Sequence, residues 1–183
     1  MCGANKLLAN IQGIPMIRRV VQAALASKVD EVIVVVGWER EKIREALTQL
    51  RCRIVLNKEY ESGQSSSVKA GLAEVTPSTH AALVLPGDVA MVDAHAIDMV
   101  LERYNVGGCL IVVAAHNGRF GHPILFDKQL FPEIDRINEE TFGLKAVVKR
   151  HQRDVCLVET GSQTVLKDID TPQDLRALSR LGR

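Results

Sequence analysis

Three short runs of apolar, mostly β-branched residues alternate with stretches of helical spacing, and this alternation constrains the fold more than any other feature of the sequence. The runs occupy 31–37, 81–88 and 109–115. Continuous apolar runs of this length are typical of strands that are buried on both faces. Stretches in which apolar residues recur at helical spacing precede or follow these runs. The pattern predicts an α/β fold with a mostly parallel sheet that is covered by helices on both faces.

The remaining elements are expected from shorter patterns. Helices are expected at 16–27, 39–50, 94–104, 127–136, 144–150 and 172–181, with another that begins in the serine run 65–67. Shorter strands are expected at 53–57, 123–126, 155–159 and 165–169. The segment 116–123 reads as a loop, and Gly161-Ser162 would close an antiparallel hairpin. A chain of 183 residues can build one well-buried core, so we expect a single domain over 1–183.

Composition excludes several classes of protein. The formal net charge is +1, so no overall field attracts the chain to nucleic acid or to an anionic membrane. Aromatic residues make up 4% of the chain, too few for a platform on which single-stranded bases stack. No apolar run approaches the ~20 residues of a membrane span, and the N-terminus lacks the apolar region of a signal peptide. We therefore expect a cytoplasmic protein with no nucleic-acid or membrane partner.

The four cysteines are Cys2, Cys52, Cys109 and Cys156, and none forms a CxxC pair. The last three lie in or beside expected strands, where a thiol usually behaves as a small buried hydrophobic group. The spacing indicates neither a zinc site nor a disulfide framework. We expect the thiols to be reduced.

Polar clusters stand where four strands would end, and ligands of open α/β sheets bind outside the carboxyl ends of the strands. The clusters are 3–6, 63–67, 86–88 and 168–172. Each also has a purely structural interpretation. Lys6 alone is most simply a surface lysine, the serines cap a helix, and Thr171 with Pro172 starts one. Together, however, two strand-end carboxylates, a lysine in a glycine loop and a helix start are the parts that hold Mg²⁺ and a triphosphate.

Five motifs in order carry a resemblance to a known family. They are G-x-x-K from Gly3, GQSSSVKAGL from Gly63, G-D at Gly87, HNGRFGHPILF from His116 and DIDTPQDL from Asp168. This order resembles the MobA-like nucleotidyltransferases, and within them most closely the molybdenum cofactor cytidylyltransferases. The resemblance implies a three-layer Rossmann-like fold of the nucleotide-diphospho-sugar transferase type. It also implies transfer of a nucleoside monophosphate from CTP or GTP to the terminal phosphate of molybdopterin, with release of pyrophosphate.

The resemblance assigns roles around the triphosphate. Lys6 would contact the phosphates as a catalytic residue, and Gly3 and Gly87 would keep the backbone close to the nucleotide. Asp88 would be the catalytic ligand of Mg²⁺, and Asp170 would be its second ligand. Magnesium is therefore the cofactor that the resemblance implies.

The resemblance also assigns the base and the acceptor. The nucleotide base would lie against the start of a helix, at residues Gln64, Ser65, Ser66 and Ser67. The molybdopterin-type acceptor would be bound by residues Gly121, His122 and Pro123. A molybdoenzyme that receives the finished cofactor is a further partner that the family suggests.

The sequence departs from the family pattern at its first residues. The family's first strand and loop read roughly L-x-A-G-x-S-x-R-M-G-x-x-K, and Met1 stands where the arginine would be. The first strand, a central one, is thus expected to be missing. Two explanations remain open, a start placed too late or a shortened polypeptide on the one hand, and a variant that has lost turnover on the other.

Further departures leave alternatives open. Val89-Ala90 stands where members of the family commonly have Met-Pro. Many members also have an acidic G-D-x-G-x-R stretch at the place of 139–150, and here only Gly143 and Lys145 resemble it. The cations of that stretch, Lys145, Lys149 and Arg150, would either grip the acceptor phosphate or form a solvated helix face. Trp38 would either stack on a base or pterin or pack as a half-buried residue. The competing functions are the same fold with GTP or another phosphorylated acceptor, and a non-catalytic module that binds the cofactor for a molybdoenzyme.

Overall fold

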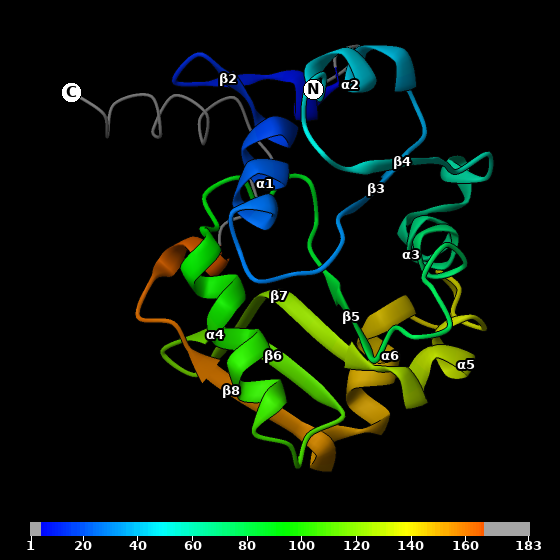
Figure 1. Cartoon of the computed structure of the whole chain (residues 1–183). Helices are drawn as coiled ribbons and strands as arrows, with labels where there is room; N and C mark the ends of the chain where they lie inside the picture. The colour runs from blue at the N-terminus through cyan, green and yellow to red at the C-terminus, as the bar shows by residue number, and fades with distance from the viewer. Residues whose placement is uncertain (1–4, 167–183) are drawn as a thin grey trace.

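The computed structural model describes residues 5–166 and shows strands and helices that alternate along most of the chain (Figure 1). The strands are β1 (Asn10–Ile11), β2 (Ile14–Pro15), β3 (Ile33–Val36), β4 (Arg53–Leu56), β5 (Ala81–Val84), β6 (Ile111–His116), β7 (Arg119–Asp127) and β8 (Val155–Glu159). The helices are α1 (Met16–Leu25), α2 (Arg40–Ala46), α3 (Gln64–Leu72), α4 (Ala94–Asn105), α5 (Phe131–Ile134) and α6 (Gly143–Arg150). The helix expected at 172–181 lies outside the described residues.

The largest sheet has four strands in the order β5-β7-β6-β8 and is mixed. β6 pairs with β8 in parallel, whereas β7 runs antiparallel to both β5 and β6. The expected loop at 116–123 is therefore wrong, because β7 begins at Arg119 and continues through the expected short strand. A tight turn joins β6 to β7, in which Asn117 and Gly118 both have positive φ, at 51° and 70°. Such turns match the twist of antiparallel strands and favour Asn-Gly.

Helices cover both faces of this sheet and make three layers. Val112 and Ala114 of β6 pack in one buried cluster with Ile97 and Val100 of α4. The alternate residues of β6 point the other way, and Val113 packs in a second cluster that includes the α5 and α6 residues. Successive side chains of a strand point to opposite faces, so one fully buried strand supplies both clusters. The strand expected at 109–115 is confirmed, and the structure shows that it is buried on both faces.

β3 and β4 form a separate parallel pair with an exact register, Ile33 opposite Arg53 through Val36 opposite Leu56. Within residues 5–166 this pair is not hydrogen-bonded to β5, so the sheet is interrupted between β3 and β5. Burial reflects the interruption. Val34 and Val36 are buried, but Ile33 and Val35 are only half-buried. All four residues of β5 are half-buried as well. Strands within 31–37 and 81–88 are confirmed, but they are less buried than expected, because within residues 5–166 each pairs with another strand along one edge alone.

The last expected hairpin is also wrong over the part that the structure describes. β8 is present as expected, but Gln163–Leu166 forms a 3₁₀ turn rather than a strand. Val165 is buried in the cluster under α4, and this packing holds the turn against the sheet. β7, and not a hairpin closed at Gly161-Ser162, supplies the antiparallel component.

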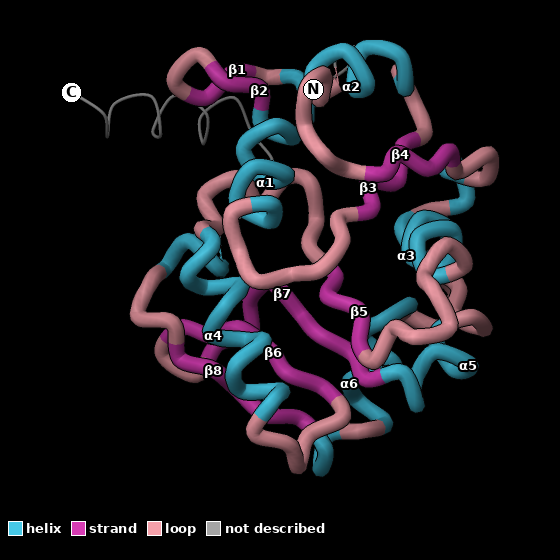
Figure 2. Tube along the Cα trace, in the orientation of Figure 1, coloured by secondary structure: helices cyan, strands magenta, loops and turns pink. Residues whose placement is uncertain are grey.

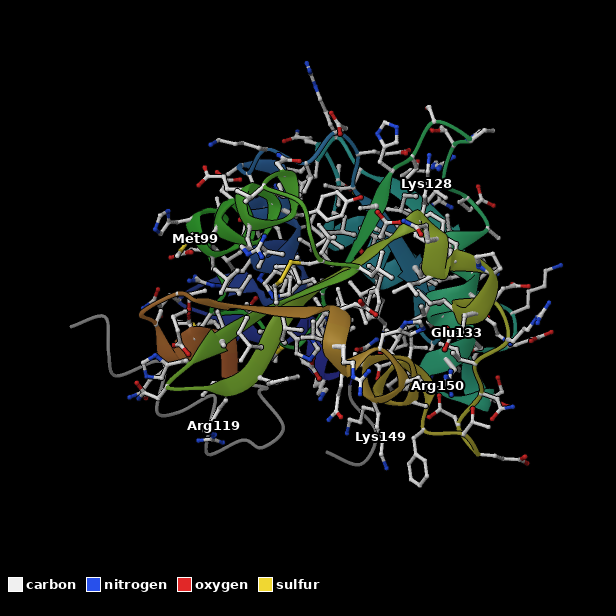
Figure 3. The ribbon with its side chains drawn as sticks, turned by 90° about the horizontal axis from the view of Figure 1, so that it is seen from below. Met99, Arg119, Lys128, Glu133, Lys149 and Arg150 are labelled. Atoms are coloured by element: carbon white, nitrogen blue, oxygen red, sulfur yellow. A yellow bond between two sulfur atoms is a disulfide. The ribbon has the colours of Figure 1, made fainter. Side chains whose placement is uncertain are left out.

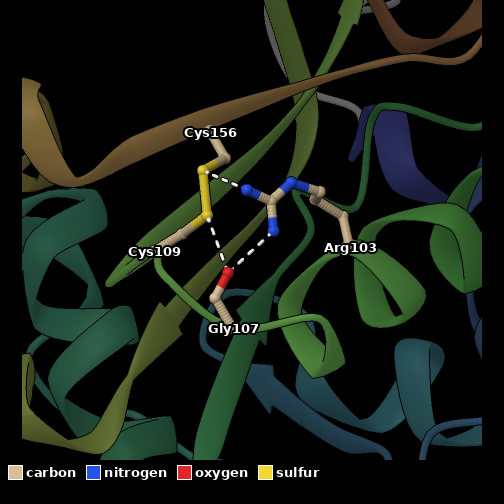
Figure 4. The surroundings of a disulfide bond; sticks show 4 residues. All are labelled: Arg103, Gly107, Cys109 and Cys156. Atoms are coloured by element: carbon tan, nitrogen blue, oxygen red, sulfur yellow. Dashed lines mark hydrogen bonds between the residues drawn. A yellow bond between two sulfur atoms is a disulfide. The ribbon is translucent and has the colours of Figure 1, made fainter.

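A disulfide joins Cys109 to Cys156, which corrects the expectation of reduced thiols at these two positions (Figure 4). Cys156 lies in β8 opposite Val112 of β6, and Cys109 precedes β6 by two residues. The Arg103 guanidinium donates to Cys156 Sγ at 2.9 Å and to the Gly107 carbonyl at 3.0 Å. Cys52 is free, as expected. The pairing was hidden in the sequence because parallel strands bring together residues 47 positions apart.

Tyr104 of α4 is tied to the sheet by its hydroxyl, which donates to Asp127 Oδ2 at 2.6 Å. Burial of the phenol, together with the hydrogen bond to Asp127 and its negative charge, raises the pKa of Tyr104 to about 12. A tyrosine whose pKa is raised on folding stabilises the protein fully below its unfolded pKa, and the contribution is lost as pH rises through the folded pKa. This part of the stability is therefore present below about pH 10 and disappears by about pH 12.

Replacing Tyr104 by Phe is expected to lower the free energy of unfolding by about 1 kcal/mol at neutral pH, the usual value of such a hydrogen bond when partly exposed. The variant should also lose less stability than the parent between pH 10 and 12, measured by urea unfolding at several pH values. Tyr60→Phe is the matched control, because its hydroxyl contacts Glu61 on the exposed surface. Equal alkaline loss in Tyr104→Phe and the parent would contradict the assignment.

Candidate active site

The structure brings two of the predicted catalytic residues into direct contact. Lys6 Nζ donates to Asp88 Oδ2 at 2.7 Å, although the residues are 82 positions apart. The lysine side chain is 33% exposed and the aspartate side chain is 21% exposed, so the pair is accessible to a ligand while partly shielded from water. Partial shielding strengthens the interaction of this pair with a bound charge.

The position of Lys6 is set by a short turn that packs on the Pro-Gly turn after β5. Lys6 starts the 3₁₀ turn Lys6–Leu8, which is capped by Asn5 because its Oδ1 accepts from the Leu7 N–H at 3.1 Å. A Cβ added to Gly87 would lie 3.2 Å from Leu7 Cδ2, so the absence of a side chain lets the two turns approach. Gly87 therefore acts through close packing, which places Asp88 beside Lys6.

Two buried residues hold the other side of Asp88. Val89 and Ala90 are 0% and 2% exposed, and they pack in different clusters of the core. The turn is closed by the Val89 N–H, which donates to the Pro86 carbonyl at 3.3 Å. The carboxylate of Asp88 is thus anchored by its neighbours on both sides.

The serine run at the start of α3 is largely engaged in internal contacts. The Asn57 amide, which follows β4, donates to Ser66 Oγ at 2.7 Å and to Ser67 Oγ at 3.0 Å. Ser65 and Ser66 are buried. The N-cap is Gly63, whose φ of 106° suits glycine, so the expected serine cap is wrong. Of the four predicted base contacts, Gln64 alone is exposed at the surface.

A carboxylate from a distant loop caps α3. Glu139 Oε1 accepts from the Ser65 N–H at 2.6 Å, across 74 positions of sequence. The backbone hydrogen bond from Ser65 is the main cause of a lowered pKa of Glu139. The start of α3 therefore already binds one anion, as helix starts do. Gly143 lies close to the same place, since an added Cβ would stand 2.8 Å from Ser65 Oγ.

The predicted acceptor residues lie within β7. Gly121 and Pro123 are buried and His122 is half-buried. A Cβ at Gly121 would stand 2.3 Å from the Val165 carbonyl oxygen, so glycine permits the backbone of the 3₁₀ turn to approach. Glu159 accepts from the Asn117 and Gly118 N–H groups at 2.9 and 2.7 Å and holds the turn before β7. Gly121 thus has a structural reason to be glycine, whatever it binds.

The cations of α6 lie on an exposed helix face, as one of the two interpretations of this stretch predicts, and their contact with the acceptor phosphate stays a prediction. Arg150 Nε donates to Glu133 Oε1 at 2.6 Å, and the two residues face each other while Lys149 points away (Figure 3). Lys145 and Lys149 are exposed. Burial alone would raise the pKa of Glu133, but hydrogen bonds from His151 and Arg150 outweigh it and lower the pKa.

The described part of the site supplies one carboxylate for a metal. Within residues 5–166, no group of three or more His, Cys, Asp or Glu side chains is arranged to hold an ion. Gly3 and Asp170 lie outside the described residues. One carboxylate still fits Mg²⁺, which usually keeps several waters and takes its other ligands from substrate phosphates. Asp88 suits this role because it is partly exposed beside a lysine that would share the phosphates.

Sequence reasoning missed Asn5 and Glu139. Asn5 Nδ2 donates to the Trp38 carbonyl at 3.4 Å and links the Lys6 turn to the end of β3. The Trp38 side chain is 48% exposed, which keeps a stacking role open. Only the fold shows the Glu139 contact, because its loop lies far from α3 in sequence. No sequence signal pointed to this contact, since the serine run 65–67 itself offers a cap for the helix start.

Comparison with known proteins places this arrangement in a family. A family model described as "MobA-like NTP transferase domain" matches residues 1–155. Bifunctional protein GlmU of Syntrophomonas wolfei is 29% identical over 99 residues, which cover 54% of this chain and 22% of that protein. The chain therefore spans less than a quarter of that relative's length. Nicotine blue oxidoreductase of Paenarthrobacter nicotinovorans is 23% identical over 180 residues, which cover 94% of this chain and 87% of that protein.

Solved structures show the same fold. Rv0371c of Mycobacterium tuberculosis H37Rv has a TM-score of 0.83 at 22% identity, over 97% of this chain and 90% of that one. The structure of its complex with manganese has a TM-score of 0.82 at 20% identity, and the match covers 97% of this chain and 93% of that one. A CMP:2-keto-3-deoxy-manno-octonic acid synthetase complexed with CTP has a TM-score of 0.77 at 14% identity, over 96% and 90%. At these identities the likeness establishes the α/β nucleotidyltransferase fold.

Proposed function

The chain belongs to the MobA-like NTP transferase family, and from that premise we propose that it transfers CMP from CTP to the terminal phosphate of a molybdopterin-type acceptor, with Mg²⁺ and with release of pyrophosphate. The observation that carries the proposal is the contact of Lys6 Nζ with Asp88 Oδ2 at 2.7 Å. A cation and a metal-binding carboxylate side by side, beyond the carboxyl ends of β3 and β5, form a site for a metal-bound triphosphate.

The chemistry asks little of the protein beyond positioning and charge neutralisation. The acceptor is a phosphate monoester with a second pKa of ~6, so it is largely a dianion at neutral pH. One of its oxygens attacks the α-phosphorus of CTP, the bond from that phosphorus to the bridging oxygen of pyrophosphate breaks, and the electron pair leaves with pyrophosphate. No proton has to be removed from the nucleophile. The Mg²⁺ bound at Asp88 would neutralise phosphate charge.

Other residues of the proposal hold the substrates in line. Lys6, with Gly3 and Gly87, would hold the triphosphate, and Asp170 would complete the metal site. The base would lie at the start of α3, where Gln64 is exposed and where Ser66 and Ser67 are held by Asn57. The acceptor would be bound by Gly121, His122 and Pro123 of β7. The manganese and CTP bound by the two similar structures support a metal and a cytidine nucleotide.

The test measures pyrophosphate release with Mg²⁺, CTP or GTP, and molybdenum-loaded molybdopterin. It is run on this polypeptide and on a version extended upstream in the same reading frame. We expect turnover with CTP, lost when Mg²⁺ is chelated and restored when it is added back. Lys6→Ala should raise the KM for CTP and lower kcat, because it removes a contact with the triphosphate.

Each other outcome selects a different function. Turnover with GTP alone would keep the reaction and change the nucleotide. A folded protein that binds molybdopterin but is inert with both nucleotides would overturn catalysis and favour a cofactor-binding module for a molybdoenzyme. The relative named as an oxidoreductase makes a redox assay with the same pterin a necessary control. Pterin-dependent electron transfer without pyrophosphate release would overturn the proposal.

A further inference from the structure

Glu139 places a carboxylate directly on the start of α3. Its Oε1 accepts from the Ser65 N–H at 2.6 Å. A Cβ added to Gly63, the N-cap of α3, would stand 2.4 Å from Glu139 Cγ and 2.7 Å from Oε1, so glycine leaves room for this side chain. Figure 2 traces the loop between α5 and α6, which carries Glu139, beside α3. The contact therefore depends on features of both partners, a glycine before α3 and a loop that is distant in sequence.

The loop that carries Glu139 is held by its own hydrogen bonds. The Gly143 N–H donates to the Asn138 carbonyl at 3.0 Å, and the Thr141 N–H donates to Asn138 Oδ1 at 2.9 Å. Ile137, just before the loop, is 3% exposed and packs in the cluster that α5 and α6 share. The carboxylate is thus fixed in position by the fold, which reduces the entropic cost of binding a ligand there.

The Glu139 carboxylate is charged and has no cation beside it in the described part of the chain. Hydrogen bonds from the backbone and the side chain of Ser65 lower the pKa of Glu139, so the group is ionised at neutral pH. Within residues 5–166, Ser65 is its one hydrogen-bond partner, and no Lys, Arg or His side chain pairs with it. A helix cap needs a single oxygen, and a neutral serine or asparagine serves as well. Glu139 therefore keeps acceptor capacity for a further donor.

Lys6 and Glu139 lie at the two ends of a row of contacts. The Lys6 turn is bonded to the end of β3 through its cap. A Cβ added to Gly37, also at the end of β3, would stand 2.4 Å from Tyr60 Cγ, so the Tyr60 turn packs against the same strand end. The Tyr60 carbonyl in turn accepts from the Gly63 N–H at 3.3 Å, and Gly63 contacts Glu139. The cation and the carboxylate therefore flank the carboxyl ends of β3 and β4.

This separation of charge gives a nucleotide one favourable orientation. A phosphate beside Glu139 would meet a like charge, and the Ser65 N–H that could bind it is already taken. Phosphates are attracted to Lys6 instead, which leaves the base beside Glu139. There the carboxylate can accept from an amino group on the edge of the base, as Glu and Asp accept from the N4 amino group of cytosine. Uracil carries an oxygen at that position, which a carboxylate repels.

We propose that Glu139 selects the base of the nucleotide, because it accepts a hydrogen bond from an exocyclic amino group and rejects a carbonyl oxygen at the same position. The inference rests on the proposed nucleotidyl transfer and adds a specificity-determining residue to it. Cytosine is the preferred base and uracil is rejected. Guanine also presents an amino group, so the test compares GTP with ITP, whose base lacks that group.

Replacing Glu139 by Gln separates base selection from helix capping. The amide has the same shape, and its oxygen can still accept from the Ser65 N–H, so a role in capping alone is rescued. Its NH₂ group is a donor, which suits the carbonyl oxygen of uracil and not the amino group of cytosine. Glu140→Gln is the matched control, because it removes the same charge from the neighbouring exposed residue.

The measurement is the affinity of the parent and both variants for CTP, UTP, GTP and ITP with Mg²⁺, by calorimetry, with thermal unfolding in parallel. The parent should bind CTP roughly 10- to 100-fold more tightly than UTP. Glu139→Gln should bring the two affinities within roughly threefold of each other, by weakening CTP and strengthening UTP. It should unfold at the same temperature as the parent. Glu140→Gln should keep the preference of the parent.

The outcomes separate this inference from the proposed function. If Glu139→Gln keeps the CTP preference of the parent, or weakens CTP and UTP by the same factor, Glu139 is a helix cap alone and the inference is overturned, while nucleotidyl transfer stands. A preference for GTP over ITP, with CTP no better than UTP, supports the role of the carboxylate and overturns cytosine as its base. A folded protein that binds none of the four nucleotides overturns the proposed function and this inference together.

Discussion

Replacing Asp88 by Asn is expected to lower metal-dependent pyrophosphate release by roughly 10³-fold, while the protein stays folded. In the proposed reaction this carboxylate holds Mg²⁺, and metal neutralisation of phosphate charge contributes several kcal/mol in such reactions. Asn keeps the size of the side chain and an oxygen, but it loses the charge that attracts the ion and Lys6. The measurement is kcat/KM for CTP in the form of the protein that turns over, together with the affinity for Mn²⁺ in the presence of CTP.

Stability separates a metal site from a structural ion pair. Lys6 and Asp88 are partly exposed, so their pairing contributes only ~1 kcal/mol or less to the free energy of unfolding. Asp30→Asn removes the same charge from an exposed position and should change neither activity nor Mn²⁺ affinity. If Asp88→Asn keeps both at the parent level, the carboxylate is only a partner of Lys6 and the metal assignment is wrong.

The parts of the fold that rest on local pattern could be predicted, and the parts that rest on strand pairing could not. β6 and α4 followed directly from apolar spacing. β7 was taken for a loop because Gly121 and Pro123 are rare inside strands. The structure tolerates them at a bulge, where β6 pairing jumps from Val113 opposite Ile124 to Ala115 opposite Phe120. The Asn117-Gly118 dipeptide was the signal for a hairpin, and it outweighs the glycine and proline.

The candidate site was predictable where its residues follow strand ends. Asp88 was assigned to the site by the rule that ligand groups gather at the carboxyl ends of strands and Lys6 by the resemblance, and the structure brings the two residues into contact. Glu139 was not predictable, because it reaches α3 only through the packing of a distant loop. The serines were predicted to contact the base directly, but Ser66 and Ser67 accept hydrogen bonds from Asn57. Local sequence does not show which hydroxyl groups the fold uses internally.

The disulfide is the second feature with a large expected effect, and reducing it should lower the free energy of unfolding by about 4 kcal/mol. Cys109 and Cys156 close a loop with a separation of 47 residues. In the chain-entropy model a loop of this length restricts the unfolded chain by about 4 kcal/mol. Urea unfolding with and without a thiol reductant measures the change, and mass spectrometry of a proteolytic digest confirms the linked peptides. The double variant Cys109→Ser, Cys156→Ser should be insensitive to reductant, whereas Cys52→Ser should respond like the parent.

Activity should be far less sensitive to reduction than stability, because the disulfide and the candidate active site lie at opposite ends of the strands. β5 and β6 are both antiparallel to β7, so they run parallel to each other and their carboxyl ends lie on the same side of the sheet. Asp88 follows the carboxyl end of β5, whereas Cys109 precedes the amino end of β6. At a temperature where the reduced protein remains folded, kcat/KM should therefore change less than about twofold, a shift of ~0.4 kcal/mol. Unchanged stability on reduction would contradict the pairing, and a parallel loss of activity in the folded state would show that the two edges of the sheet are coupled.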